Sequence, residues 1–260
     1  MKVDLRGPMT IGEIIRSAVQ AYRSQFLPFF LIALATVPLQ MLSAVITDRI
    51  SSEETESLVA IPLQIATTLV FLLTVGALVF AANRVADGQP VEAGAALDQA
   101  FAGFGRIVTT QFLYAVLTIA SIVVFPYTGY RYWQDIQRNE PRGAWTVLGL
   151  LLGTFLYFSV RWTFSIQEVM LAGRQNWAAL DASADRVVGH WWRTLGIVLV
   201  VSMAVIPASV FAANPAEIPI LAAATVGSLL LAFVLPFVII AQTLLYFDLK
   251  AREQSDVSVV

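Results

Sequence analysis

The sequence predicts an all-α protein that crosses a membrane with six transmembrane helices, arranged as three tandem units of one amphipathic helix plus two spans. Three observations support this prediction. Of the 260 residues, 58% are hydrophobic and 13% are charged, whereas about one quarter of a soluble domain is charged. Charged residues divide the chain into six long uncharged runs, and similar short segments precede the first, third and fifth of them.

The uncharged runs have the length of membrane spans. Each is close to, or longer than, the roughly 18 to 20 apolar residues that cross a hydrocarbon core about 30 Å thick. Because the runs are continuous and do not alternate with polar residues, they predict helices and not the strands of a barrel. The turn "NPAEIP" separates the last two, since its prolines end one helix and start another. The runs are 24–47, 57–83, 107–130, 143–160, 194–216 and 218–247.

Basic residues predict that both termini are cytoplasmic. With this orientation most Lys and Arg residues fall on inner segments, as the positive-inside rule expects. The first span follows a charged, amphipathic segment and is expected to stay as an anchor, because no short apolar signal region precedes it. We therefore expect a multi-pass protein of the bacterial cytoplasmic (inner) membrane. The only basic residues in the predicted outer loops are Arg49, Arg131, Arg138 and Arg142.

Three short segments predict an internal repeat. They read "GEIIRSAVQAY" from Gly12, "GAALDQAFAGF" from Gly94 and "WAALDASADRV" from Trp177. Their spacing predicts units at approximately 10–82, 90–165 and 175–247 within a single membrane domain, residues 1–260. An even number of spans per unit makes the units parallel, related about an axis along the membrane normal.

The short helices are amphipathic. In the first, Ile14, Ile15, Ala18 and Tyr22 share one face, and Thr10 with Glu13 predicts a capping box. Such helices are expected at the membrane interface, although packing of these helices on each other is the open alternative. The aromatic residues expected at headgroup depth are Trp177, Trp191 and Trp192.

Catalytic constellations are missing from the sequence. His190 is the only histidine, and its tryptophan neighbours indicate an interfacial side chain and not a base. Asp181 and Asp185, four residues apart, fit a solvated helix face. The chain has no cysteine, no nucleotide-binding loop and no metal-ligand spacing. We therefore expect no enzyme activity, no catalytic residue, no cofactor and no metal site, and the net charge of −2 argues against a nucleic-acid partner.

Polar and small residues inside the runs predict contacts between helices. Gln40, Gln64, Gln111 and Gln242 are spread over different runs, as expected for interhelical hydrogen bonds. "GLLLG", from Gly149 to Gly153, is a small face that we expect to mark close packing within the chain, with a dimer contact as the alternative. "AATVG", residues 223–227, is interpreted in the same way.

Arg161 and Glu168 are charges at the end of the fourth run. At about 1.5 Å per residue from position 143, Arg161 lies about 27 Å along the helix, at the inner boundary. We expect it to be a structural anchor that holds the third short helix in register. Glu168 is too distant to pair with it, and Arg193 is its candidate partner.

A resemblance extends over the whole chain. The segment "YFSVRWTFSIQEVMLAGRQNWAALDASADRVVGHWWRTLGI", the opening "MTIGEIIRSAVQAYRSQF" and the closing "LLYFDLKARE" resemble the bacterial glycerophosphoryl diester phosphodiesterase membrane-domain-like family. The resemblance implies a stand-alone, six-span inner-membrane protein with cytoplasmic termini and without the catalytic domain. "ALDAS" departs from a more basic family pattern, since Asp181 and Ala182 replace cations that would meet anionic headgroups.

The functional expectation is a non-catalytic membrane scaffold or partner-binding module. Its expected partners are membrane lipids and other membrane or cytoplasmic proteins. The alternative is a small-molecule or lipid transporter, which the repeat and the charges at Arg161 and Glu168 favour. Against transport, no ionisable residue lies in the middle of a span.

Overall fold

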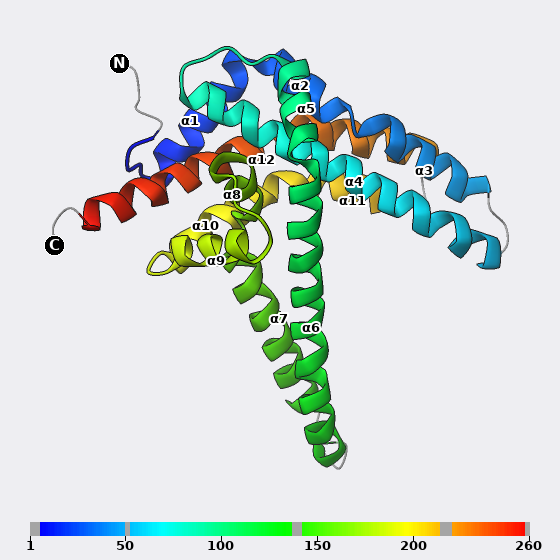
Figure 1. The fold of residues 1–260 in the computed structure, drawn as a ribbon. Coiled ribbons are helices and arrows are strands. Elements are labelled where there is room, and N and C mark those ends of the chain that lie inside the picture. The colour runs from blue at the N-terminus through cyan, green and yellow to red at the C-terminus, as the bar shows by residue number, and fades with distance from the viewer. Residues whose placement is uncertain (1–5, 50–52, 137–141, 214–219, 258–260) are drawn as a thin grey trace.

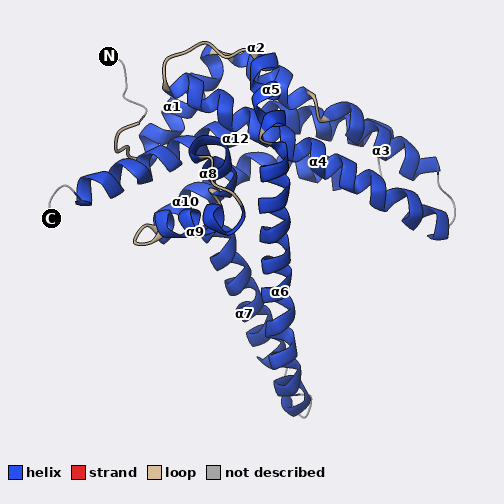
Figure 2. Ribbon diagram, in the orientation of Figure 1, coloured by secondary structure: helices blue, strands red, loops and turns tan. Residues whose placement is uncertain are grey.

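The described part of the protein is entirely helical. The structure, a computed structural model, describes residues 6–49, 53–136, 142–213 and 220–257 (Figure 1), and these contain helices, turns and loops but no strand (Figure 2). The predicted all-α class is confirmed. In chain order the helices are α1 (Ile11–Ser24), α2 (Phe26–Leu34), α3 (Val37–Arg49), α4 (Glu53–Ala86), α5 (Ala93–Ala102), α6 (Phe104–Ile136), α7 (Arg142–Arg161), α8 (Ser165–Ala172), α9 (Asn176–Val187), α10 (Trp191–Ser202), the 3₁₀ turn η1 (Met203–Val205), α11 (Ile206–Ala213) and α12 (Ile220–Val257).

Several of these helices have the length and apolar character of membrane spans. Within the described residues four qualify, and a fifth is added if α5 and α6, bent by 63° at Gly103, form one broken span. The chain is therefore a membrane protein. The expected fourth span forms α7 but is not among these candidates, so six spans remain a prediction. The "NPAEIP" turn falls at residues 214–219, outside the described residues. The four helices are Phe26–Ile46, Val59–Ala86, Trp191–Val210 and Leu221–Ser255.

The three predicted short helices exist as α1, α5 and α9. Their main contacts differ: α5 packs against α4, α9 packs against α6 and α8, and α1 packs against α12 at the other end of the chain. The capping box of α1 is confirmed, because Thr10 N–H donates to Glu13 Oε2 at 2.7 Å and Glu13 N–H donates to Thr10 Oγ1 at 3.3 Å. The bond from the Thr10 backbone holds the pKa of the Glu13 carboxyl below its ordinary value.

The short helices are buried more deeply than an interfacial position requires. α1 buries Ile14, Ala18 and Tyr22, and α9 buries Leu180 and Val187 together with the small residues between them. For α9, packing on neighbouring helices describes the arrangement better than an interfacial position, because α6, α7, α8 and α12 all contact it. Burial also raises the pKa of Tyr22 to about 12, and its O–H donates to the carbonyl of Phe233 at 2.7 Å.

The helix hairpins form two diverging arms. In Figure 1, α3, α4, α11 and the first half of α12 extend to one side, whereas α6 and α7 run away from the body as a separate pair. The contacts agree, because α12 packs on α3, α4 and α11, while α6 packs on α7 along its length and on α4 only near its start. The spans are thus packed unequally, and superposition of the three units remains a prediction.

A close approach of α4 and α6 fixes the point at which the second arm leaves the body. A Cβ atom at Gly76 would lie 2.7 Å from Cδ1 of Ile107, whose side chain is fully buried. Met170 of α8 fills the same corner, since its sulfur is 3.3 Å from the equivalent position at Gly103. The missing side chain at Gly76 lets the end of the Ile107 side chain lie against the backbone of α4.

Replacement of Gly76 by leucine should therefore destabilise the junction. The added side chain overpacks the contact with Ile107, for which we expect a loss of about 1–3 kcal/mol of unfolding free energy. Thermal unfolding in detergent measures the effect. Gly105→Leu is the control, because nothing lies within 4 Å of a Cβ atom at Gly105 and leucine favours a helix. Equal melting temperatures for the two variants would contradict the role of Gly76.

Candidate functional site

A buried carboxylate ties the start of the chain to its last helix. Asp248 of α12 is fully buried. Its Oδ1 accepts from the Met9 backbone N–H at 2.7 Å and from Arg252 Nε at 3.0 Å. Its Oδ2 accepts from Arg193 Nε and Nη2 at 3.1 and 3.0 Å. Nη2 of Arg193 and Nη2 of Arg252 also donate to the Met9 carbonyl at 2.6 and 3.1 Å.

In this group, the Asp248 cluster, both oxygens of the carboxylate accept hydrogen bonds. An ionised carboxylate removed from water is costly unless nearby donors replace the lost hydration. Here four hydrogen bonds and two guanidinium groups do so, and Arg252 comes from one helical turn further along α12. The cluster joins the segment before α1, the first turn of α10 and the end of α12.

A second buried carboxylate, Glu168 of α8, forms a separate cluster. Arg186 of α9 donates from Nε and Nη2 to Glu168 Oε1 at 2.9 and 2.7 Å, and Arg174 lies 3.5 Å from Oε2. The Arg186 guanidinium also lies 4.5 Å from the centre of the Tyr246 ring, and it pairs with Glu253 at 3.3 Å. This Glu168 cluster connects α8, α9 and α12.

These pairings correct one prediction about the charges. Arg193 is not the partner of Glu168, because it binds Asp248, and Arg186 takes the place beside Glu168. The expectation that Glu168 contacts a short helix is confirmed, since Arg186 belongs to α9. The chain turns at residues 162–164 between α7 and α8, which removes the straight geometry on which the earlier pairing was based.

Arg161 lies next to α9, as expected, but its side chain does not hold that helix. Its guanidinium donates to the hydroxyl of Tyr157 in the same helix at 2.8 Å. The contact with α9 is made by backbone atoms of residues 161 and 164. The Arg161 carbonyl accepts a hydrogen bond from Ser183 Oγ at 3.0 Å, and the Phe164 N–H donates to the same Oγ at 3.1 Å. Register therefore depends on the buried hydroxyl of Ser183.

The remaining residues singled out in the sequence have varied surroundings. Trp177 and Trp192 are largely exposed, whereas Trp191 is half-buried, stacks on Tyr157 and meets Trp192 edge to face. Their place at headgroup depth stays a prediction. Asp181 and Asp185 are exposed, which agrees with a solvated face, and His190 is half-buried before α10.

The glycines of α7 have no close neighbour among the described residues. Gly149 and Gly153 are exposed, and nothing lies within 4 Å of a Cβ atom placed on either of them. The expected close packing at these two glycines is therefore not found among the described residues, although α7 contacts α6, α9 and α10 elsewhere. In the second small face Ala223 and Gly227 of α12 are buried, and Gly227 lines the cavity described next, so close helix packing there stays a prediction.

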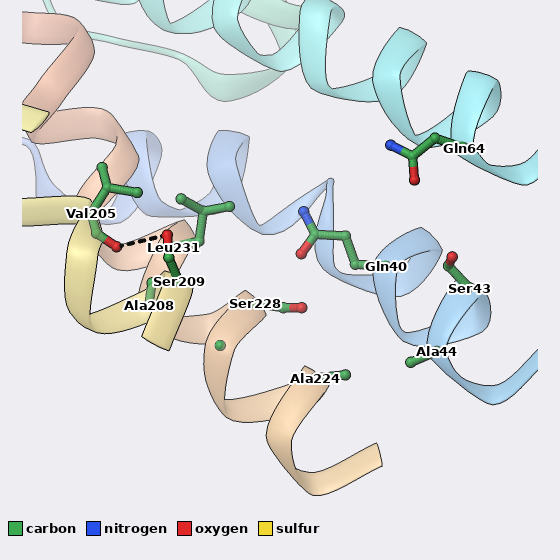
Figure 3. Close-up of a pocket in the computed structure, with 11 residues that line it drawn as sticks. Gln40, Ser43, Ala44, Gln64, Val205, Ala208, Ser209, Ala224, Ser228 and Leu231 are labelled. Atoms are coloured by element: carbon green, nitrogen blue, oxygen red, sulfur yellow. Dashed lines mark hydrogen bonds between the residues drawn. The ribbon is translucent and has the colours of Figure 1, made fainter. Parts of the chain in front are cut away.

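A cavity of about 540 Å³ lies among α3, α4, α11 and the start of α12. Gln40 and Ser43 of α3, Gln64 of α4, and Ser209 and Ser228 supply its polar lining. In Figure 3 the Ser228 side chain points from α12 toward α3, and the dashed line is the bond from Ser209 Oγ to the Val205 carbonyl, 3.3 Å long. None of the residues that line the cavity is ionisable.

Apolar packing follows the cavity on the side of the Asp248 cluster. On that side a buried apolar cluster of Ala33, Val37 and Ala232 fills the space between α2, α3 and α12. Asp248 follows Ser228 by 20 residues on α12, about 30 Å at 1.5 Å per residue. The cavity and the charged cluster are therefore separated by about the thickness of a bilayer core.

The sequence did not predict the roles of several of these residues. Asp248 directly follows the last uncharged run, and its acidic side chain four residues before Arg252 is the signal that would have found it. Arg186 carries no such signal, because its partner lies on another helix. Gln40 and Gln64 were noted one by one, but nothing in the sequence brings them to one cavity.

Comparisons with known proteins add no further constraint. No protein-family model, curated protein or solved structure matches this chain. Among the described residues, no three His, Cys, Asp or Glu side chains are grouped so that they could hold a metal ion.

Asp248→Asn should destabilise the fold strongly. The amide cannot accept all four hydrogen bonds, and two adjacent guanidinium groups lose their counter-charge, for which we expect a loss of about 3 kcal/mol. Thermal unfolding in detergent measures this. Asp185→Asn makes the same chemical change at an exposed site and should be neutral. A stable Asp248→Asn protein would show that the cluster is dispensable.

The two arginines beside α9 should differ in their importance. Arg161→Leu removes one hydrogen bond within α7, so we expect a loss of about 0.5–1 kcal/mol. Arg186→Leu leaves the buried Glu168 carboxylate without its main partner, so we expect a loss of about 3–5 kcal/mol. Melting temperatures of both variants in one detergent test this order, and the reverse order would refute it.

Proposed function

We propose that this protein is a non-catalytic membrane scaffold that binds another membrane protein through its α6–α7 hairpin. The observation that carries the proposal is the open glycine face of α7. In membranes, small residues let helix backbones approach closely, and this close packing is a main source of helix association. Gly149 and Gly153 have that pattern, and no part of the described chain covers them.

The base of the protein has the properties of a rigid support. Buried charged groups are used to join helices: the Asp248 cluster connects α1, α10 and α12, and the Glu168 cluster connects α8, α9 and α12. Carboxylates held by arginines in this way join helices, and they are poorly suited to proton transfer. A fixed base with a projecting hairpin is the arrangement that a scaffold requires.

The surface of the hairpin supports a transmembrane helix as its occupant. Leu152 and Phe155, which flank the glycines, have exposed fractions of 56% and 41%, so the face is apolar beside its small centre. An apolar face with small residues at its centre matches another membrane helix.

We place the protein in the bacterial cytoplasmic membrane with both termini in the cytoplasm. Arg174, Arg186, Arg193 and Arg252 surround the two buried carboxylates at one end of the helices. The positive-inside rule assigns such an end to the cytoplasm. The resemblance to the glycerophosphoryl diester phosphodiesterase membrane-domain-like family is consistent with this placement and with three tandem units.

Transport is the second candidate, and the cavity is the observation that favours it. A permease needs a route that continues from the cavity to the other side of the membrane. One turn beyond Ser228 toward Asp248, α12 buries Ala232 against Ala33 and Val37, and this packed apolar contact argues against such a route. The geometry therefore favours a static role over transport.

Photo-crosslinking in intact membranes tests the docking face. A photoreactive residue at position 152 should give one discrete protein adduct, because Leu152 lies beside the glycines. The second substitution Gly153→Leu should abolish that adduct by replacing a small residue with a bulky one, without a loss of thermal stability, since no chain atom lies within 4 Å.

Two controls define the outcomes. Gly196→Leu places the same side chain on an equally open glycine of α10 and should leave the adduct unchanged. A photoreactive residue at Leu199, which is 49% exposed on α10, should give only lipid adducts. Protein adducts of equal yield from both positions would contradict the proposal. An adduct of twice the 28.4 kDa chain mass would replace the separate partner by a second copy.

A further inference from the structure

The lining of the cavity selects against charged ligands. Two carboxamides and three hydroxyl groups line it, together with apolar residues such as Leu231 and Ala224. A charged ligand would lose its hydration here without gaining a counter-charge. A neutral ligand that both donates and accepts hydrogen bonds fits the lining, because each carboxamide offers both functions.

The polar groups of the cavity have capacity for such a ligand. Gln40 is half-buried and Ser228 is 6% exposed, and no hydrogen bond to other described residues occupies either side chain. In a membrane, polar groups without partners are costly, since the hydrocarbon core supplies no water to replace them. A ligand hydroxyl between α3 and α12 would satisfy both residues.

An apolar groove continues from the cavity along α4. It has a volume of about 270 Å³ and is lined mainly by Ile61, Ile65 and Leu69, and Gln64 belongs to both the groove and the cavity. Ile61 and Ile65 have exposed fractions of 61% and 55%. A polar cavity beside an apolar groove suits an amphiphile, which has a headgroup at one end and a hydrocarbon chain at the other.

The depth of the cavity points to the same class of ligand. It lies about 30 Å along α12 from Asp248, which is the thickness of the hydrocarbon core. If the charged cluster lies at one membrane surface, the cavity lies at the level where the headgroups of the opposite leaflet begin. A lipid of that leaflet can enter sideways without crossing the core.

We propose that the cavity among Gln40, Gln64 and Ser228 binds the headgroup of a neutral lipid that carries at least two hydroxyl groups, with its acyl chain in the groove along α4. One hydroxyl lies between Gln40 and Ser228, and another reaches Gln64. This site does not depend on the α6–α7 docking face, which belongs to the other arm of the molecule.

Lipid binding to the purified protein tests the proposal. The protein is held in an amine-oxide detergent, whose headgroup has no hydroxyl group, and is titrated with monoolein, a neutral lipid with two free hydroxyls. Bound lipid is counted by native mass spectrometry, and the rise in melting temperature is followed in parallel. We expect one monoolein to bind saturably, with no comparable binding of methyl oleate, glycerol or anionic phosphatidylglycerol at equal concentrations.

Variants locate the site. Gln40→Leu removes hydrogen bonds and Ala224→Leu fills the cavity, and each should raise the half-saturating monoolein concentration about fivefold to tenfold. Melting temperatures of the lipid-free variants establish that they are folded, and either variant alone suffices if the other is not. Gln242→Leu is the matched control, because it changes the same residue type on α12, 14 residues beyond Ser228, and should bind as the unmodified chain does.

Four results would each overturn the proposal. The first is an absence of saturable monoolein binding to the unmodified protein. The second is equal binding of methyl oleate or phosphatidylglycerol, which would show that the headgroup is not read. The third is equal stabilisation by glycerol, which would make a soluble polyol the ligand. The fourth is unchanged affinity in folded cavity variants, or equal weakening by Gln242→Leu.

Discussion

The packing of this protein depends on the need to satisfy carboxylates that are buried among apolar helices. Asp248 and Glu168 are both fully buried, and each pairs with an arginine from another helix, Arg193 of α10 and Arg186 of α9 respectively. An apolar contact between membrane helices is weakly selective, because lipid tails are as apolar as leucine. A buried charge is selective, since only a few geometries provide the donors that it requires. The two clusters therefore decide which helix ends meet.

This selectivity explains which features the sequence could predict. The lengths of the apolar runs follow from bilayer thickness, so helices long enough to cross a membrane were expected, and four or five of them are found among the described residues. The three short helices followed from their amphipathic pattern, and they exist as α1, α5 and α9. The pairing of Glu168 was predicted wrongly because it depends on the turn at residues 162–164, which rotates α8 away from the line of α7. No local pattern signals such a turn between two apolar helices.

The glycine face of α7 shows a second limit of sequence reasoning. A small-residue pattern states that a close contact is possible, but it does not state with which helix. Ala223 and Gly227 of α12 face the chain itself, whereas Gly149 and Gly153 do not. The difference arises from the bend at Gly103 and the close contact at Gly76, which direct the second arm away from the first. The sequence did not predict the cavity, because its lining comes from α3, α4, α11 and α12, which lie far apart in the chain.

The bond from Met9 to Asp248 also sets an order of assembly during synthesis. The two residues are 239 positions apart, so the segment before α1 emerges long before the carboxylate that holds it. At about 5–20 residues per second, the ribosome needs roughly 12–48 s to cover that distance. For this interval α1 has no α12 to pack against, so it reaches its final packing only at the end of synthesis. Once α12 is complete, Asp248 can bind the backbone of Met9.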